Sequence, residues 1–227
     1  MESQLGFLVR RGYRGETFTR ALTRRPSGRT LVVTFDDAFK SVYDLAAPIL
    51  TRLGLPASLF VPTDYIETGE PIAWAGTDHW LAGEHREELS GMNWDEIRSL
   101  AHAGWEIGSH TGSHPFLTQI GDQALANELQ RSRQTCEERL NQPCWSLAYP
   151  YGDVDVRVVA AAREAGYTAA ATLPSRLRPL GPLEWPRVGV YHDDSTARFR
   201  LKASRLVRRT RGSNVWSLVD RTRKRTP

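Results

Sequence analysis

Short apolar segments alternate with longer amphipathic segments along this chain, and this alternation restricts the fold more than any other feature. The apolar segments favour β-strands, and the segments between them place apolar side chains at helical spacing. The predicted strands are residues 30–35, 57–61, 105–110, 145–150, 167–172 and 187–191. The predicted helices are residues 40–54, 93–104, 122–140 and 153–166. Strands separated by helices run mostly parallel, so the chain is predicted to be an α/β protein whose sheet is open or closed into a barrel.

Capping residues and apolar spacing set the expected ends and buried faces of the helices. Asn93 followed by Glu96 is the pattern of a capping box at the start of one helix. Asp153 is expected to cap another helix. The predicted buried face of the helix at 40–54 consists of Val42, Leu45, Ala46, Ile49, Leu50 and Leu53.

The bulk composition is that of a water-soluble globular domain. The 227 residues are 40% hydrophobic and 25% charged, which is enough apolar material for a core. No apolar run approaches the roughly 20 residues of a membrane span. The N-terminal residues lack the basic-then-apolar pattern of a signal peptide. We therefore expect a cytoplasmic or membrane-peripheral location, with export by another route left open.

The charge of the chain is unevenly distributed. Residues 198–227 contain eleven arginines and lysines and a single acid, Asp220, so the preceding residues are net acidic. Such a tail is either a solubilising, partly disordered end or a segment attracted to an anionic membrane surface. The acidic body and the lack of a recognition motif argue against specific binding of nucleic acid.

The two cysteines, Cys136 and Cys144, match no zinc-ribbon or redox motif by their spacing. We expect them to be buried or free thiols. Their spacing gives no argument for a disulfide.

Polar residues follow three of the predicted strands. Asp36 and Asp37 come directly after the first strand, His110 and His114 lie at and after the third, and a Pro-Tyr-Gly turn follows the fourth. Since the carboxyl ends of parallel strands meet at one edge of a sheet, these segments are expected to form one site. A surface turn would explain the paired aspartates alone, but it would not explain the two later motifs.

The residue types in this site indicate metal chemistry. His110 and His114 are four residues apart, so a helical turn or a tight loop points both at one ion. One aspartate completes a two-His, one-carboxylate set and leaves an open position for water, an arrangement that suits hydrolysis by Zn²⁺. The other aspartate can then take the proton of the water.

These motifs resemble those of a known family. The segments TFDDAFKSVYDLAAPIL, GWEIGSHTGSHP, LAYPYG and AGYTAAAT are similar to the polysaccharide deacetylases, the NodB-homology domain of carbohydrate esterase family 4, and the AYPYG form is similar to the subset acting on poly-N-acetylglucosamine. The resemblance covers about residues 30–200. It implies a distorted (β/α) barrel and metal-dependent removal of N-acetyl groups from amino sugars. It also suggests an N-terminal lead-in at 1–29, a deacetylase domain at 30–197 and a basic tail at 198–227.

The resemblance also assigns roles to particular residues. It makes Asp36 the general base and makes Asp37, His110 and His114 the metal ligands. It places Pro150 and Tyr151 in the substrate groove, with the backbone N–H of Tyr151 stabilising the oxyanion.

Three positions depart from the family pattern. Ala38 stands where the family usually has glycine, which is harmless unless the position requires a positive φ. Many members have an arginine, paired with the base, where this chain has Ala148; our hypothesis is that Arg187 supplies that charge. The histidine that serves the family as general acid has no clear counterpart, and His192 is the nearest candidate.

Aromatic residues supply candidate sugar-binding surfaces. Trp74 and Trp80 fall in the long segment 63–92, which is expected to form a rim over the site, and Trp185 precedes the last predicted strand. These three rings could stack on sugar faces. Trp94 and Trp105 are expected in the core.

The sequence thus favours a Zn²⁺-dependent deacetylase of an N-acetylated polysaccharide or glycan precursor. Two alternatives stay open. One is a deacetylase or deformylase of a lipid- or nucleotide-linked amino sugar on the cytosolic side, and the other is a glycan-binding module that has lost turnover.

Overall fold

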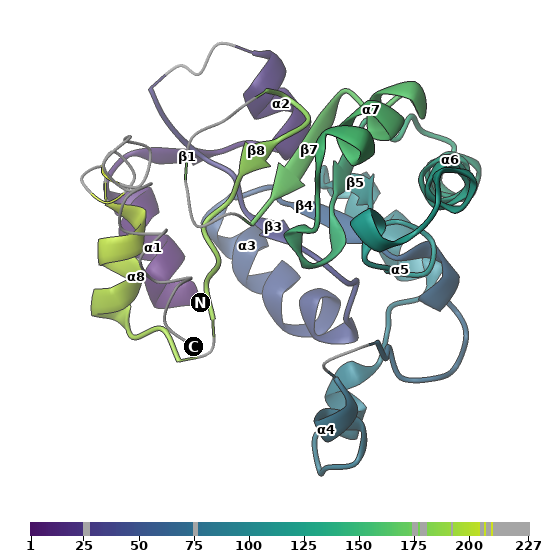
Figure 1. Cartoon of the computed structure of the whole chain (residues 1–227). Coiled ribbons are helices and arrows are strands. Elements are labelled where there is room, and N and C mark those ends of the chain that lie inside the picture. The colour runs from purple at the N-terminus through teal and green to yellow at the C-terminus, as the bar shows by residue number, and fades with distance from the viewer. Residues whose placement is uncertain are drawn as a thin grey trace, which may run out of the picture.

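The computed structural model describes residues 1–24, 28–74, 77–173, 177, 181–191, 193–204, 207 and 210. A six-stranded sheet lies at its centre, with the strands in chain order and every neighbouring pair parallel (Figure 1). The strands are β3 (Thr34–Phe35), β4 (Ser58–Val61), β5 (Glu106–Ser109), β6 (Ser146–Ala148), β7 (Ala169–Thr172) and β8 (Trp185–Pro186). This curled, mostly parallel sheet confirms the predicted α/β barrel class. Within the described residues, no helix is both long and apolar enough to cross a membrane.

Helices connect the strands and pack against the outer face of the sheet. They are the π-helix η1 (Val42–Ala46), α3 (Ala47–Leu53), α5 (Trp94–His102), α6 (Asp122–Leu140) and α7 (Val156–Glu164). The predicted bounds of α6 are confirmed, and α5 begins with the predicted capping box between Asn93 and Glu96. Trp94 and Trp105 are buried, as expected. Both cysteines are free and buried, as predicted.

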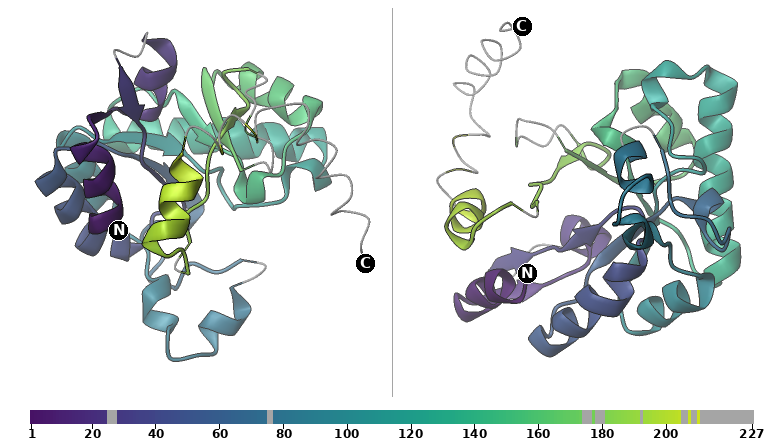
Figure 2. Two further views of the ribbon diagram at one scale, coloured as in Figure 1. Left: turned by 90° about the vertical axis from the view of Figure 1, so that its left-hand side faces the viewer. Right: turned by 90° about the horizontal axis from the view of Figure 1, so that it is seen from below.

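The N-terminal residues form a second layer beside the sheet. They comprise α1 (Glu2–Arg10), β1 (Tyr13–Gly15) and α2 (Phe18–Thr23), and β1 pairs in parallel with β2 (Arg29–Leu31). The last described helix, α8 (Thr196–Ala203), lies beside α1 (Figures 1 and 2). The domain boundaries at 29 and 197 stay predictions.

The two faces of the sheet bury different clusters. Leu59 and Val61 of β4 pack with the helices, whereas Phe60 between them faces the inside of the curled sheet. There Phe60 meets Phe18 of α2 edge to face at 5.7 Å. The other fully buried members of the inner cluster are small, Ala148, Ala169 and Ala171, and the partly buried Leu22 and Val32 pack against them. Small side chains leave space inside the barrel, and α2 occupies that space at one end.

Two details of the predicted helices are wrong. Leu45 was expected on the buried face of its helix but is 67% exposed, because the π-helix η1 widens the turn and rotates that side chain outward. Asp153 was expected to cap the helix that follows it, but α7 begins later and its cap is Asp155, which accepts from the N–H of Val158 at 2.8 Å. The carboxylate of Asp153 instead accepts from the backbone N–H and the hydroxyl of Thr118.

The last strand lies earlier than predicted. Residues 187–191 were expected to form it, but the pairing falls on Trp185 and Pro186 and ends with the N–H of Arg187 donating to Thr172. Beyond that point no strand is assigned as far as Tyr191. A methyl group at Gly189 would lie only 2.7 Å from the hydroxyl oxygen of Tyr191, so the Tyr191 ring folds back over the glycine.

The segment at 63–92 contains short helices, namely η2 (Thr63–Tyr65), α4 (Asp78–Leu81) and η3 (Arg86–Leu89). Figure 1 shows that α4 projects away from the body of the molecule, whereas the start of the segment stays close to the sheet. The N–H groups of Thr63 and Asp64 donate to the carbonyls of Thr111 and Gly112. The segment is thereby joined to the loop that follows β5.

Candidate metal centre

The predicted site residues meet at the carboxyl edge of the sheet. Asp36 and Asp37 follow β3, His110 and His114 lie on the loop after β5, and Arg187 follows β8. Parallel strands bring these segments together because all of them emerge at the same edge. The sequence argument for one shared site is therefore supported by the positions of the elements.

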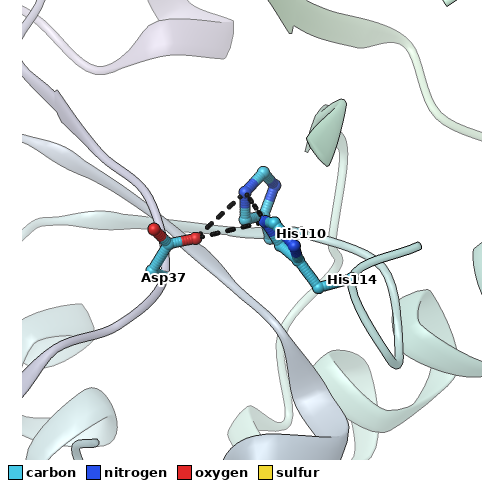
Figure 3. Close-up of side chains that lie close together, drawn as sticks. All are labelled: Asp37, His110 and His114. Carbon is cyan, nitrogen blue, oxygen red and sulfur yellow. Dashed lines mark hydrogen bonds and ion pairs between the residues drawn. The ribbon is translucent and has the colours of Figure 1, made fainter. Parts of the chain in front are cut away.

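Asp37, His110 and His114 form a compact donor group (Figure 3). Oδ1 of Asp37 lies 3.2 Å from Nε2 of His110 and 3.5 Å from Nε2 of His114, and the two Nε2 atoms are 3.2 Å apart. Ligands held at 2.0–2.1 Å by a tetrahedral ion are separated from one another by about 3.3–3.4 Å. The three separations therefore match the ligand spacing of a single tetrahedral metal ion.

The hydrogen bonds around these donors leave their metal-facing atoms free. Nδ1–H of His110 donates to the carbonyl oxygen of Ala148 at 2.7 Å, which places the lone pair of the neutral ring on Nε2. Within the described residues, Oδ1 of Asp37 is buried and makes no well-aligned hydrogen bond. A buried carboxylate oxygen without a donor is unfavourable unless a cation binds it. The residues present therefore fit a divalent metal ion.

The electrostatics of the group also favour a cation. Burial by itself would raise the pKa of Asp37, but the adjacent imidazoles lower it far below the ordinary value. Burial opposes charge on His110, yet the neighbouring Asp37 and Asp36 carboxylates raise the pKa of that histidine. The pKa of His114 is lowered, first by burial and also by the adjacent His110. The ionised Asp37 thus favours a positive charge beside it, whereas burial and the adjacent His110 oppose protonation of His114.

Asp36 is held by Arg187. Both guanidinium nitrogens donate to its carboxylate, Nη1 to Oδ1 at 2.7 Å and Nη2 to Oδ2 at 2.8 Å, and Nη1 also donates to the hydroxyl of Thr34. Burial by itself would raise the pKa of Asp36, but the charge and hydrogen bonds of Arg187, together with the charge of His110, lower that pKa overall. The sequence analysis proposed that Arg187 supplies the positive charge beside Asp36, and in the structure its guanidinium contacts that carboxylate.

Several site residues have left-handed backbone conformations. Asp37 and Ala38 have φ of 74° and 53°, and Thr111, His114 and Tyr151 have φ of 68°, 58° and 58°. Each such non-glycine residue costs about 1–3 kcal/mol. The position of Ala38, where the family usually has glycine, does require a positive φ.

Aromatic rings surround His114. Trp74 stacks on its ring at 3.8 Å between centroids, and Tyr151 meets it edge to face at 4.7 Å. Tyr151 in turn stacks on Phe116 at 3.9 Å. Trp74 was predicted as a sugar-stacking residue, and in the structure one of its faces covers a metal-ligand candidate. Pro150 and Tyr151 lie beside the site as predicted, while their roles stay predictions.

Some candidates fall outside this site, and some members of it were not predicted. His192, the candidate general acid, lies outside the described residues. Trp80 and Trp185 are exposed, and neither is among the rings described around His114. Sequence reasoning did not find Phe116 or Glu128, which contact Tyr151 and the histidine loop through the folded chain. No local motif marks either residue.

Fold and site together define a class of protein, a parallel barrel-type α/β domain with a candidate mononuclear metal centre at its carboxyl edge. Comparison with known proteins makes the class specific. The polysaccharide deacetylase family matches residues 23–170, which is more than half of the chain. The chain therefore belongs to the polysaccharide deacetylase family, and the predicted enzyme class, hydrolases of carbon–nitrogen amide bonds, is confirmed at the level of that family.

Individual relatives are distant. YxkH of Bacillus subtilis is 27% identical over 149 residues, covering 66% of this chain and 46% of YxkH. The poly-β-1,6-N-acetyl-D-glucosamine N-deacetylase of Staphylococcus aureus is 23% identical over 133 residues, covering 55% of this chain and 41% of that enzyme. The chain thus spans less than half the length of these curated relatives.

Solved structures share the fold. The Streptococcus pyogenes deacetylase PplD, solved in complex with acetate, has a TM-score of 0.74 at 20% identity and covers 89% of this chain and 85% of its own. IcaB from Ammonifex degensii has a TM-score of 0.70 at 24% identity and covers 93% of this chain and 88% of its own. At these identities the likeness supports the fold alone.

Proposed function

We propose that this chain is a Zn²⁺-dependent deacetylase that removes N-acetyl groups from the amino sugars of a polysaccharide or glycan precursor. The observation that carries the proposal is the spacing of Asp37, His110 and His114, which suits one tetrahedral ion, beside a second aspartate held by Arg187. The named activity of the Staphylococcus aureus relative supports an N-acetylglucosamine polymer as the substrate class.

Asp37, His110 and His114 would hold the ion. When bound there, a divalent cation polarises the amide carbonyl and lowers the pKa of a water molecule that it binds to about 7. Asp36 is the adjacent acceptor for the proton of the attacking water, because its carboxylate lies beside the ligands and is kept ionised by Arg187. The guanidinium also fixes the orientation of the carboxylate through two parallel hydrogen bonds.

The segment after β6 would serve the developing oxyanion and the sugar. The backbone N–H of Tyr151 is the proposed oxyanion donor, and the left-handed conformation of this residue turns the chain sharply beside His114. Pro150 and the ring of Tyr151 would line the groove. The face of Trp74 that does not cover His114 would contact the apolar surface of a sugar ring.

Acetate release from chito-oligosaccharides and from poly-β-1,6-N-acetylglucosamine, measured together with zinc content, tests the proposal. Asp36→Asn should lower kcat/KM by about 10²–10⁴-fold while the bound zinc stays at the wild-type level. Asp44→Asn, at an exposed aspartate of η1, is the matched control and should behave as wild type. A glycan-binding module without turnover would bind both polymers and release no acetate, with or without Asp36.

A lipid- or nucleotide-linked amino sugar is the competing substrate, and one surface favours a membrane-peripheral location for it. Arg11 of the N-terminal layer and Arg200 of α8 both place their guanidinium carbons 4.4 Å from the ring centroid of Phe7. Each cation near anionic lipid contributes roughly 1 kcal/mol to binding. Co-sedimentation with vesicles containing phosphatidylglycerol should fall on removal of residues 198–227 and fall further with Arg11→Gln. Equal binding by all three proteins would end the membrane proposal, and the polymer assays above then decide the substrate.

A further inference from the structure

The loop that carries both candidate histidine ligands is held in a strained shape. It runs from His110 to His114, and two of its non-glycine residues, Thr111 and His114, have positive φ. Such conformations persist only where the surrounding structure fixes them. His110 emerges directly from β5, whereas His114 lies at the far end of the loop. The backbone of the loop, together with the rings of Trp74 and Tyr151 that pack on His114, therefore determines where the second imidazole lies.

Glu128 of α6 makes the largest set of contacts that fix this loop. Its Oε2 accepts from the backbone N–H of Gly112 at 2.8 Å and of Ser113 at 2.9 Å. Its Oε1 accepts from the hydroxyl of Ser113 at 2.8 Å. Of the other three N–H groups of the loop, those of Thr111 and His114 donate to the nearby hydroxyls of Ser109 and Thr111, and that of His110 donates to the carbonyl of Val61. A single carboxylate thus binds the two central N–H groups of the turn.

An ion pair between Arg131 and Asp64 holds the other side of the histidine loop. Arg131, one helical turn after Glu128, binds both oxygens of Asp64 at 2.6 Å, and the N–H of Asp64 donates to the carbonyl of Gly112 at 3.1 Å. The side chains of Arg131 and Glu128 pack closely against Gly112 of the loop. A methyl group at Gly112 would lie 2.6 Å from Nη2 of Arg131 and 3.0 Å from Oε2 of Glu128.

We propose that Glu128 is a positioning residue of the metal centre, whose carboxylate sets the position of His114 by binding the turn of the histidine loop from α6. It touches neither the ion nor the substrate. The inference rests on the proposed metal-dependent function and adds a residue to the apparatus that prepares the site for the cation. Residues that orient metal ligands typically change metal affinity 10–100-fold when they are replaced.

The test measures zinc affinity by competition with a chelator, and the absorption spectrum of the Co²⁺-substituted protein. In Glu128→Ala we expect zinc affinity to fall 10–100-fold, with a Co²⁺ spectrum of altered intensity and band position. Glu128→Gln keeps an oxygen for the two N–H groups and an amide that can donate to the Ser113 hydroxyl, so it should stay within about threefold of wild type. Glu138→Ala, at an exposed glutamate of the same helix, is the matched control and should leave both measurements unchanged.

The outcomes separate this inference from the function on which it rests. If the wild-type protein binds no zinc, the proposed function itself fails. If the wild type binds zinc and Glu128→Ala has the same affinity and the same Co²⁺ spectrum, the positioning role is refuted. Should Glu128→Ala not fold, Glu128→Met, which preserves side-chain volume and helix propensity while removing both acceptors, replaces it with the same expected and refuting results.

Discussion

The two ends of the central sheet each hold a carboxylate, and the two are satisfied in different ways. At the amino end, Glu106 accepts from the N–H and hydroxyl of Thr19 at 2.8 and 2.5 Å and from the hydroxyl of Ser146 at 2.6 Å. At the carboxyl end, Asp37 has an oxygen without a well-aligned donor in the described structure and faces two imidazole nitrogens. The first carboxylate is satisfied by neutral donors of the protein, and the second lies in a group that fits a cation.

The difference contrasts a carboxylate that joins parts of the fold with one that belongs to the candidate metal centre. Neutral hydroxyl and amide donors hold Glu106 without competing for a metal, and they anchor α2 in the mouth of the barrel. The two nitrogens that face Asp37 belong to imidazoles, and in its neutral form each carries a lone pair there in place of a hydrogen-bond donor. A buried acid surrounded by fixed donors therefore indicates structure, whereas one surrounded by acceptors indicates a binding site.

The largest expected effect comes from replacing the carboxylate of Asp37. Asp37→Asn should reduce zinc affinity by more than about 100-fold, beyond the loss typical of outer residues, and acetate release should fall with it. The metal-free variant should melt within about 4 °C of the metal-free wild type, corresponding to roughly 1 kcal/mol. Chelator competition and thermal melts in EDTA measure the two effects. If Asp37→Asn bound zinc with wild-type affinity, Asp37 would not be a metal ligand and the contrast with Glu106 would be wrong.

Arg187→Met should have the next largest effect. It leaves Asp36 without its charged partner, so kcat/KM should fall about 10–100-fold while zinc content stays unchanged. Because Arg187 lowers the pKa of Asp36, its removal raises that pKa, and the acidic limb of the rate profile should move to higher pH. Arg187→Lys should recover part of the rate. An unmoved acidic limb in the Met variant would argue against Asp36 as the base.

At the opposite end, Glu106→Ala should lower the free energy of unfolding by about 1–3 kcal/mol, because its donors lose their acceptor. Glu106→Gln should cost less, since the hydroxyls of Thr19 and Ser146 can rotate to suit an amide. Neither change should alter zinc affinity. Urea denaturation and zinc titration of both variants make the comparison, and a loss of zinc in Glu106→Gln would show that the two ends are coupled.

The smallest expected effect is that of Ala38→Gly. Glycine relieves a left-handed conformation worth about 1–2 kcal/mol. It also frees the unfolded chain by about 0.4–1 kcal/mol and removes a buried methyl group worth about 0.8 kcal/mol. These effects oppose one another, so the free energy of unfolding should change by less than about 1 kcal/mol. Urea denaturation measures it, and a change above 2 kcal/mol in either direction contradicts this reasoning.

The sequence was most informative where local rules decide the structure. Apolar spacing predicted the bounds of α6, capping chemistry predicted the start of α5, and the polar residues at strand ends predicted the Asp37, His110 and His114 group. Each of these signals depends on residues that are close in sequence or on a general property of parallel sheets.

Prediction failed where a local irregularity or a contact between distant segments overrides the simple pattern. Leu45 is exposed because a π-helix interrupts its helix, and no simple apolar spacing reveals such an insertion. Asp153 binds Thr118 instead of capping its own helix. Glu128 meets Gly112 only after α6 has packed beside β5, so its contribution to the site has no motif.

The pairing of Asp36 with Arg187 has a consequence for the synthesis and folding of the protein. The two residues are 151 positions apart and follow the first and the last strand of the sheet. A nascent chain that has made the aspartates and both histidines still lacks the guanidinium. Contacts of such long sequence separation form at a high entropic cost, late in assembly. Incomplete translation products would then carry the candidate ligands without the guanidinium that binds Asp36, and the proposed site would be complete only once synthesis has passed Arg187.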